Sequence, residues 1–581
     1  MLHGLICSLL VQWLLFSVKQ AVAETALSNS PVPGETAPPE ALDNYGSAYR
    51  PQIHWSPPVG FMNDPNGLFI DASGIWHLYF QYNPAELSVG NQHWGHAISQ
   101  DLYHWVPQKN AISPEGDGLI FSGSAARDVN NTSGLFPVGN GSNNVLAFYT
   151  SALSGLQTQD VAYSTDGGYT FTKYAKNPVL NYHSPDFRDP KVFWHRETSK
   201  WVMTVAFAVD RLIAFFTSSD TIDWAPASNF SLAGEIGVIY ECPNLVEVPV
   251  LKDGYTEDKF ARSNIDGTAW LLLFSLVAVA PLGDSVNQYI PGSFNGTHFE
   301  AFDEEIRLTD WGQDNYAAQF WDGIPPDQGQ VMIPWASNWQ YTNDVPTDVA
   351  GFRGVLGLPR ITGLAHTYGG KWTMISRPYP FPSSLFTNLD PSPSSNDSNS
   401  SITVAATTRV ITNATSHVDI STAPALPVSA FTLKLKAASL SNRTLGGNMN
   451  FTFTITSTAE SLRGGYVLGC NDNGNVGTVW LDRSGMKGYS STHFTAHFSH
   501  SYPQDPNRSS IEVLVVVDRA IIEVFLDGGV GASGTAVWFQ SHEAVLAGGI
   551  DLLQLSSRVE GEGDVQAEIQ GLKSVWTEES L

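Results

Sequence analysis

Cysteine is almost absent from this sequence: its 581 residues contain three, at positions 7, 242 and 470. Cys7 lies in an N-terminal segment that we expect to be removed, which leaves Cys242 and Cys470, far apart in the chain. A disulfide framework is therefore excluded, and no Cys/His cluster has the spacing of a zinc site. We predict a protein without metal or other cofactor, whose stability comes from its hydrophobic cores.

Positive charge is also scarce. The chain has 30 Lys and Arg against 56 Asp and Glu, a formal net charge of −26. Nucleic acids and anionic membranes are attracted by Lys and Arg, so this surface would repel both. The charge balance favours a protein with a neutral substrate and with neither nucleic acid nor membrane as a partner.

Long apolar runs are few. Residues 5–18 form one, followed by the small-x-small signature Ala21-Val22-Ala23. A run of 14 residues is shorter than the ~20 that cross a bilayer, so we predict a secretory signal peptide over 1–23. Residues 269–280 form a second run, which we interpret as a buried strand.

Sequons for N-glycosylation agree with secretion, to the extracellular space or the cell wall. Their density indicates a secreted glycoprotein. They start at Asn130, Asn131, Asn140, Asn229, Asn295, Asn396, Asn399, Asn413, Asn442, Asn450 and Asn507.

Helical periodicity is nearly absent, and short apolar-aromatic runs separated by Gly, Asn, Asp and Pro indicate an all-β protein. Five runs recur at intervals of roughly 55–70 residues, which suits four-stranded propeller blades. A sandwich or a pair of barrels remains an alternative on this pattern alone. The runs are 75–80, 145–149, 201–205, 270–274 and 331–335.

Composition divides the chain into segments. A Ser/Asn/Pro-rich stretch marks a linker near residues 387–401, and the short strands after it suit a β-sandwich. We expect the sandwich to pack on the propeller and to contribute to stability or to a homodimer. The predicted segments are a signal peptide (1–23), a disordered lead-in (24–49), a propeller catalytic domain (50–385), a linker (386–402) and a sandwich (403–581).

Three carboxylates stand close before prolines in the first β domain. Asp64 lies in the stretch GFMNDPNG, Asp189 precedes Pro190, and Glu241 lies two residues before Pro243. Proline holds the preceding residue in an extended backbone and so narrows where its side chain points. The pattern is not specific, because Asp390 and Asp505 also precede prolines, and Asp64 alone would be read as a turn residue.

Two carboxylates are the usual apparatus for cleaving a glycosidic bond. Glu241 has apolar and aromatic neighbours, which predicts a raised pKa and the role of acid, whereas Asp64, among Asn and Gly, is expected to stay ionised. Sugar-compatible side chains crowd the same region, although Trp94 also suits a core and Gln81 a turn cap. They are Trp55, Asn63, Gln81, Trp94 and His96.

Four motifs in order along the chain resemble glycoside hydrolase family 32, which includes invertases, inulinases, levanases and fungal fructosyltransferases. They are Met62-Asn63-Asp64-Pro65-Asn66-Gly67, Phe121-Ser122-Gly123-Ser124, Arg188-Asp189-Pro190 and Glu241-Cys242-Pro243. The stretch 518–525 is similar to a strand of the family's C-terminal sandwich. The resemblance implies a five-bladed β-propeller followed by a β-sandwich.

The resemblance also implies roles. Asp64 matches the nucleophile, Glu241 the general acid/base, and Asp189 the transition-state stabiliser beside Arg188. The mechanism would be retaining, with the carboxyl groups of Asp64 and Glu241 about 5–5.5 Å apart. The positions implied to line the fructose subsite are Asn63, Gln81, Trp94, Phe121, Ser122, Arg188 and Trp335.

The expected activity is that of a secreted, exo-acting β-fructofuranosidase, which releases terminal fructose from sucrose or fructans. A fructosyltransferase using the same site is the alternative, and a non-catalytic carbohydrate-binding protein the remote one. Two residues depart from the family pattern: Phe61 stands where Trp is usual, and Gly354 where many members have Ser. Cys242, beside the acid/base, is either a tuning residue or a buried filler.

Overall fold

In the part of the chain that the structure describes, most regular elements are strands. The computed structural model describes residues 43–116, 118–139, 141–153, 155–231, 237–255, 259–277, 283–386, 409–412, 416–421, 430–438, 449–457, 460–471, 474–505, 508, 510–531, 533–546, 552–559 and 564–576. Within these ranges the one α-helix is α2, His542–Leu546. The 3-10 helices are η2 (Asp43–Gly46), η3 (Gly141–Asn143), η4 (Arg262–Asn264), η5 (Pro346–Ala350), η6 (Tyr368–Gly370) and η7 (Ser383–Leu385).

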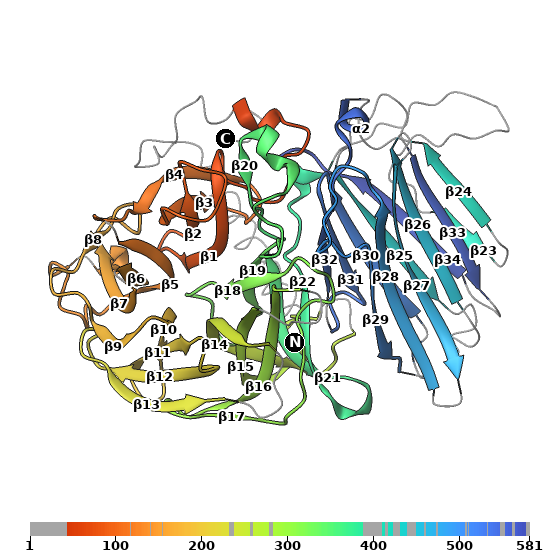
Figure 1. Ribbon diagram of the computed structural model, residues 1–581. Helices are drawn as coiled ribbons and strands as arrows, with labels where there is room; N and C mark the ends of the chain where they lie inside the picture. Colours follow the sequence, from red (N-terminus) through yellow and green to blue (C-terminus); the bar gives the residue numbers. More distant parts are fainter. Residues whose placement is uncertain are drawn as a thin grey trace, which may run out of the picture. The chain divides into compact units, whose positions relative to one another are not determined.

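The strands of the first part of the chain pair in five successive antiparallel units, each with four main strands (Figure 1). The first unit is β1 (Gly60–Ile70), β2 (Trp76–Asn83), β3 (His93–Ser99) and β4 (Trp105–Ile112). The second is β5 (Leu119–Arg127), β6 (Val145–Leu153), β7 (Leu156–Ser164) and β8 (Thr172–Lys173), with β9 (Leu180–Ser184) also paired to β7. The third is β10 (Phe187–His195), β11 (Lys200–Phe207), β12 (Leu212–Ser218) and β13 (Ala225–Phe230).

The remaining two units share one sheet. The fourth is β14 (Ile239–Leu251), β15 (Ile265–Val277), β16 (Val286–Phe294) and β17 (Phe299–Ala301), and the fifth is β18 (Tyr316–Phe320), β19 (Gln330–Trp335), β21 (Arg360–His366) and β22 (Trp372–Pro378). They are joined by a parallel pairing of β14 with β21, while β20 (Phe352–Arg353) pairs parallel with β1. The first strands of the units contact one another in a closed ring, β1–β5–β10–β14–β18–β1. This arrangement is a β-propeller, and we assign one blade to each unit.

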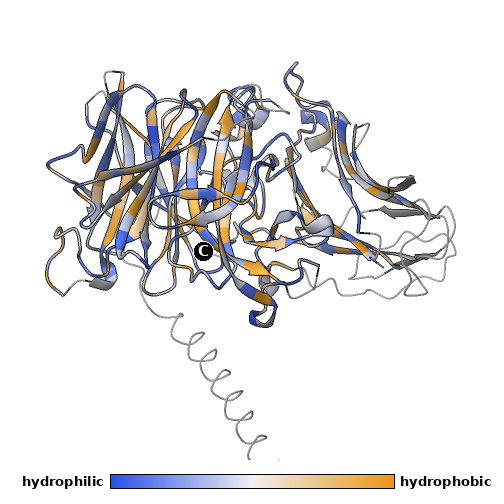
Figure 2. Cartoon of the chain, turned by 90° about the horizontal axis from the view of Figure 1, so that it is seen from below, coloured by the Kyte–Doolittle hydropathy of each residue, from blue (hydrophilic) through white to orange (hydrophobic). Residues whose placement is uncertain are grey.

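The five apolar runs that predicted the blade period occupy equivalent places. Each coincides with the second strand of a unit: β2, β6, β11, β15 and β19. Residues 269–277 of the second long apolar run lie in β15, which confirms the buried strand there. The second strand is apolar because it is covered by neighbouring blades on both faces, and Figure 2 shows apolar residues along the strands of the propeller.

The C-terminal part forms two six-stranded sheets, as expected for a β-sandwich. One sheet runs β23 (Arg409–Thr412), β34 (Asp564–Gly571), β25 (Ala430–Ala438), β30 (Ser510–Asp518), β31 (Ile521–Leu526) and β32 (Gly534–Val537). The other runs β24 (Ser416–Ser421), β33 (Leu552–Val559), β26 (Met449–Ser457), β27 (Glu460–Asn471), β28 (Gly474–Gly485) and β29 (His497–Pro503). Alternate residues of β25, β26 and β30 face one shared core.

Buried charges join the two domains. Arg360 of β21 donates from Nη2 to Oε2 of Glu523 in β31 at 3.1 Å, and both side chains are fully buried. His54, ahead of β1, contacts Oδ2 of Asp518 in β30 through Nδ1 at 2.8 Å. Removing one partner of such a pair would leave a buried charge without its counterion. The sandwich therefore supplies carboxylate partners for buried basic side chains of the propeller.

The predicted signal peptide 1–23, residues 24–42 of the lead-in, and residues 387–402 of the linker lie outside the described residues. The prediction of a disordered lead-in is wrong for its last part, 43–49, because this part packs against the body of the protein. Tyr45 and Tyr49 are buried. The ring of Tyr45 stacks on Trp576 at 4.1 Å between centroids, and Trp576 donates from Nε1 to the carbonyl of Pro51 at 2.7 Å. Burial of these aromatic side chains holds the segment in place, although its composition predicted disorder. Among the described residues, no helix has the length and apolar character needed to cross a membrane.

Candidate active site

A β-bulge interrupts the first strand of every blade at the same level. At each bulge two residues face a single residue of the second strand, which bends the chain and redirects side chains. Register is lost between Met62 and Pro65 in β1, Ile120 and Gly123 in β5, Arg188 and Lys191 in β10, Glu241 and Asn244 in β14, and Tyr316 and Gln319 in β18. Four of the five bulges hold or adjoin residues predicted for the site, so the ring of first strands brings the motifs together.

Prolines and positive φ angles shape these bulges. Pro65, Pro190 and Pro243 each lie at the end of a bulge, where a missing N–H costs no ladder hydrogen bond. The extended backbone expected before proline is wrong for Asp189, which has φ +66°. Cys242, directly before Pro243, has φ +51°, and both lie in a region that non-glycine residues rarely enter. Strained backbone of this kind persists only where the surroundings hold it, and it is concentrated at functional sites.

Asp64 lies at the centre of the site. Its Oδ2 accepts a hydrogen bond from Oγ of Ser122 at 2.6 Å, and its Oδ1 accepts one from Nδ2 of Asn63 at 3.1 Å. Asn63 is held in turn by Gln92, whose Nε2 donates to its Oδ1 at 3.1 Å. All of these side chains are buried. The hydrogen bonds leave Asp64 with one defined orientation.

Asp189 is tied to the strand that carries Glu241. The backbone N–H of Cys242 donates to Oδ2 of Asp189 at 2.9 Å. The thiol Sγ of Cys242 lies 3.7 Å from the same oxygen and 3.5 Å from Oδ2 of Asp64. Cys242 thus contacts both aspartates and is also fully buried in a hydrophobic cluster, so both of its predicted roles stay predictions. It is a free thiol, and burial raises its pKa well above the usual range.

Glu241 is the most open of the three carboxylates, with 19% of its side chain exposed. Arg188 approaches its Oε1 with Nε at 2.9 Å and Nη2 at 2.7 Å. The hydroxyl of Tyr316 donates to its Oε2 at 2.5 Å. Tyr316 comes from the fifth bulge and was not among the predicted site residues. No local signal in the sequence marks its approach to Glu241.

The electrostatics differ from the sequence-based expectation. Burial raises the pKa of Asp64 to about 6, Ser122 lowers it by hydrogen bonding, and the charge of Glu241 raises it further. Burial also raises the pKa of Asp189 to about 7, with Glu241 raising it and Arg188 lowering it. Asp64 was expected to stay ionised, and with a pKa of about 6 it is ionised for the most part at neutral pH but not in mild acid. Its polar sequence neighbours did not reveal that the fold buries it beside other carboxylates.

Two predicted binding residues carry buried polar atoms without a partner in the described structure. Neither amide atom of Gln81, which faces the bulge of Asn63 and Asp64, makes a hydrogen bond, and neither does Nε1 of Trp335. Burying a polar group without a partner is costly. These groups are positioned to bond a ligand that offers hydroxyl groups.

Trp94 occupies a supporting position. It is fully buried against Tyr79, and its Nε1 donates to the carbonyl of Phe121 at 3.0 Å, so its one donor is engaged. We therefore place Trp94 behind the backbone of Phe121. Trp55 and His96 of the sugar-compatible group are also fully packed core residues.

The two departures from the family pattern lie beside the site. Phe61 is fully buried, and its ring lies 6.4 Å from that of Trp339, which packs on Trp335 at 4.9 Å. Gly354 has φ +92°, and a Cβ there would lie 2.0 Å from the carbonyl oxygen of Met62. This backbone requires glycine, which explains why a larger residue is absent at position 354.

Among the described residues, no group of His, Cys, Asp and Glu side chains has an arrangement that could hold a metal ion. The buried carboxylates are engaged by hydrogen-bond donors and Arg188 instead. The site thus has Asp64 fixed by hydrogen bonds, Glu241 oriented by one guanidinium and one phenol hydroxyl, and the unpartnered amide of Gln81. Together these groups suit acid–base and nucleophilic chemistry on a polyol.

Comparison with known proteins agrees with this geometry. Residues 54–374 match the model of the glycosyl hydrolases family 32 N-terminal domain. The chain belongs to glycosyl hydrolase family 32. It is 35% identical over 537 residues to an invertase of Debaryomyces hansenii, covering 90% of this chain and 93% of that protein.

Further family 32 members show the same relationship. An invertase of Schizosaccharomyces pombe is 43% identical over 328 residues, an alignment that covers about half of either protein, 54% and 53%. The structure of a β-fructofuranosidase from Schwanniomyces occidentalis, complexed with fructosyl-erythritol, superposes with a TM-score of 0.75 at 31% identity, covering 90% of this chain and 98% of that one. Family membership and the propeller-plus-sandwich fold predicted from the motifs are thereby confirmed.

Proposed function

We propose that this family 32 protein is a retaining β-fructofuranosidase that releases terminal fructose from sucrose and fructans. The observation that carries the proposal is the hydrogen-bonded cluster of Asp64, Asp189 and Glu241 in the ring of bulges. Relatives named invertase and extracellular exo-inulinase support this substrate class.

In the first step, a carboxylate oxygen of Asp64 attacks the anomeric carbon of the fructosyl unit. The bond to the leaving oxygen breaks, and that oxygen takes the proton of Glu241. From sucrose, glucose leaves and a covalent fructosyl-enzyme remains. Hydrogen bonds from Ser122 and Asn63 orient the attacking carboxylate.

In the second step, Glu241 removes a proton from water, which attacks the same carbon and frees fructose with retained configuration. Arg188 and Tyr316 hold the Glu241 carboxyl in place for both proton transfers. Asp189 bonds fructose hydroxyls and stabilises the positive charge that develops in the transition state. Asn63, Gln81 and Trp335 supply further hydrogen bonds to the sugar.

The experiment is incubation with concentrated sucrose, with glucose, fructose and trisaccharides measured over time. Equal release of glucose and fructose supports the hydrolase. Glucose in excess of fructose, with trisaccharide formed, would favour the fructosyltransferase instead. NMR of the first product formed should show β-fructofuranose, because the mechanism is retaining.

The matched pair of variants is Asp64→Ala and Asp223→Ala, the second at an exposed aspartate of the same domain. The first should abolish fructose release and the second should leave it unchanged. Release that survives Asp64→Ala would exclude Asp64 as the nucleophile. No release by the unmodified chain would leave the remote alternative, a carbohydrate-binding protein.

We also infer that the protein is secreted and N-glycosylated. Support comes from the predicted signal peptide and from exposed sequon asparagines, among them Asn130, Asn229, Asn295 and Asn450. Expression in a yeast host should place the activity in the medium, and endoglycosidase treatment should lower the mass of the product. A protein retained in cells at the mass of the bare chain would contradict this inference.

A further inference from the structure

A pocket opens in the propeller, apart from the carboxylate cluster. Its volume is about 390 Å³, which lies within the range of small-molecule sites. On β5, β10, β14 and β18 its lining residues follow the bulges toward the C-terminal end of each strand, as Lys191 follows Asp189 and Phe320 follows Ala318. None of Asp64, Asp189 and Glu241 lines it.

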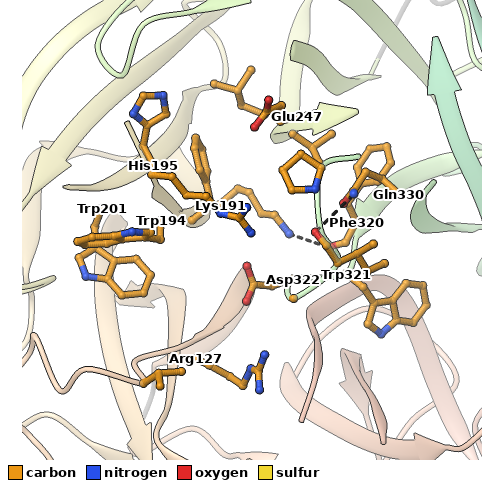
Figure 3. Close-up of a pocket in the computed structure, with 18 of the residues that line it drawn as sticks. Arg127, Lys191, Trp194, His195, Trp201, Glu247, Phe320, Trp321, Asp322 and Gln330 are labelled. Carbon is orange, nitrogen blue, oxygen red and sulfur yellow. Dashed lines mark hydrogen bonds between the residues drawn. The ribbon is translucent and has the colours of Figure 1, made fainter. Parts of the chain in front are cut away.

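The floor of this pocket is charged. Lys191, which is 6% exposed, donates from Nζ to the carbonyl of Phe320 at 2.7 Å, and this bond uses one of its three N–H groups. Asp322 lies close by in the pocket (Figure 3). Burial raises its pKa, while the charges of Lys191, Arg127 and Arg196 lower it. An ammonium and a carboxylate side by side can donate to and accept from neighbouring hydroxyl groups.

The wall of the pocket is aromatic. Trp194 is half-buried and meets Trp201 edge to face at 5.3 Å, and both rings stand together on one side in Figure 3. Trp270, also half-buried, packs on Phe193 at 5.4 Å. Partly exposed indole faces offer flat apolar surface of the kind that covers the C–H face of a sugar ring.

The charge of the lining argues against an anionic ligand. Three cationic side chains are matched by four carboxylates, so the lining has no excess of positive charge. A phosphate or nucleotide site would need such an excess. Flat aromatic surface together with paired donors and acceptors suits a neutral polyhydroxylated molecule.

We propose that this pocket is a second carbohydrate site, which binds a neutral mono- or disaccharide with its ring against Trp194 and its hydroxyls on Lys191 and Asp322. The site holds sugar without cleaving it. It is independent of the proposed catalytic function, because a sugar could bind here whether or not the carboxylate cluster is active.

The test is hydrogen–deuterium exchange on the full chain carrying Asp64→Asn, so that sucrose is not consumed. Sucrose should slow exchange in segment 191–201 and in segment 320–330, in addition to segment 60–70 of the catalytic centre. Adding Trp194→Ala should weaken sucrose binding at the first two segments at least tenfold and leave segment 60–70 protected, which also reports that the variant is folded.

Asp322→Asn is the second variant, because Trp194→Ala removes a ring that packs on Trp201 and the Asn side chain is nearly isosteric with Asp. Asp322→Asn should weaken sucrose binding at the same two segments. Protection confined to segment 60–70 would overturn the proposal. Protection of segment 191–201 that survives both variants would do the same. Inorganic phosphate that protects these segments as well as sucrose does would show an anion site instead.

Discussion

The first strands of the propeller and the strands of the sandwich differ in the regularity of their pairing. All five first strands are bulged at one level. In the sandwich, β25 pairs with β30 and β34, and β26 pairs with β27 and β33, without a register shift. The pairing of β27 with β28 has one shift, between Ser461 and Arg463. Regular pairing gives a stable sheet with alternating faces, whereas a bulge turns a side chain out of that alternation. The chemistry of this protein lies where the sheets are irregular.

Backbone strain follows the same division. In the propeller, Asp189, Cys242 and Ala317 have positive φ inside strands. In the described part of the sandwich, the non-glycine residues with positive φ are Arg519 and Asp527, which follow the ends of strands at turns. Such a conformation costs about 1–2 kcal/mol per residue. The propeller thus carries a cost in stability at its site that the sandwich avoids.

The largest expected effect comes from Asp64→Asn. It should lower kcat on sucrose by about 10⁴-fold or more, because the nucleophile is removed. It should also raise the free energy of unfolding at pH 7 by roughly 1–3 kcal/mol. The pKa of Asp64 in the folded protein, about 6, lies above its pKa in the unfolded chain. The ionised carboxylate therefore destabilises the fold, and this effect is fully present above pH 6. At pH 3, where the carboxyl is mostly protonated in both states, the gain should be almost lost.

Asp482→Asn is the control from the sandwich. Asp482 is buried but accepts hydrogen bonds from Ser484 and Arg463, and despite burial these interactions lower its pKa. The same substitution should therefore lower stability at pH 7, by about 1 kcal/mol. Urea unfolding of Asp64→Asn and Asp482→Asn would measure the two changes in unfolding free energy. Loss of stability in both would contradict the idea that the site is built at a cost.

Glu523→Gln should remove the charge that pairs with Arg360 across the domains. We expect a loss of up to about 3–5 kcal/mol in unfolding free energy, since the buried Arg360 would keep Asp310, 3.4 Å away, as its one remaining carboxylate partner among the described residues. Glu512→Gln, which removes the more exposed pair with Lys434, should cost less than about 1 kcal/mol. Equal losses would show that the buried pair does not couple the domains.

Ala317→Gly and Ala437→Gly compare one residue type in the two settings. Both alanines are fully buried, but Ala317 has φ +48° in a bulge and Ala437 lies in the regular strand β25. Glycine relieves the first conformation and weakens the second. Thermal unfolding should show Ala437→Gly to be about 1 kcal/mol more destabilising than Ala317→Gly. The reverse order would mean that the bulge is unstrained.

The smallest effect is expected from Ser122→Ala. Its hydroxyl donates to Asp64 and so favours the ionised form. Removing it should raise the pKa of Asp64 and move the acid limb of kcat/KM to higher pH, by about half to one unit. Ser124→Ala, whose hydroxyl contacts backbone groups instead, should leave that limb in place. A shift in the opposite direction would contradict the hydrogen-bond role.

Much of this arrangement could be predicted from the sequence, because its strongest signals are local. The apolar period marks the second strand of each blade, and the motifs around Asp64, Asp189 and Glu241 carry the site residues. Local signals could not show what long-range contact decides. Glu241 has apolar neighbours in sequence, yet Arg188 and Tyr316 surround its carboxyl.

The bulges themselves could not be predicted from the sequence. A bulge depends on the pairing of two strands, which no single stretch encodes.

The stacking of Tyr45 on Trp576 brings the first and last parts of the described chain to one place. A short linker could therefore join these two positions, and new ends could be opened elsewhere. The protein is on this account a candidate for circular permutation. A fusion partner attached near Tyr45 would emerge beside one attached near Trp576, which limits how two such modules could be carried at once.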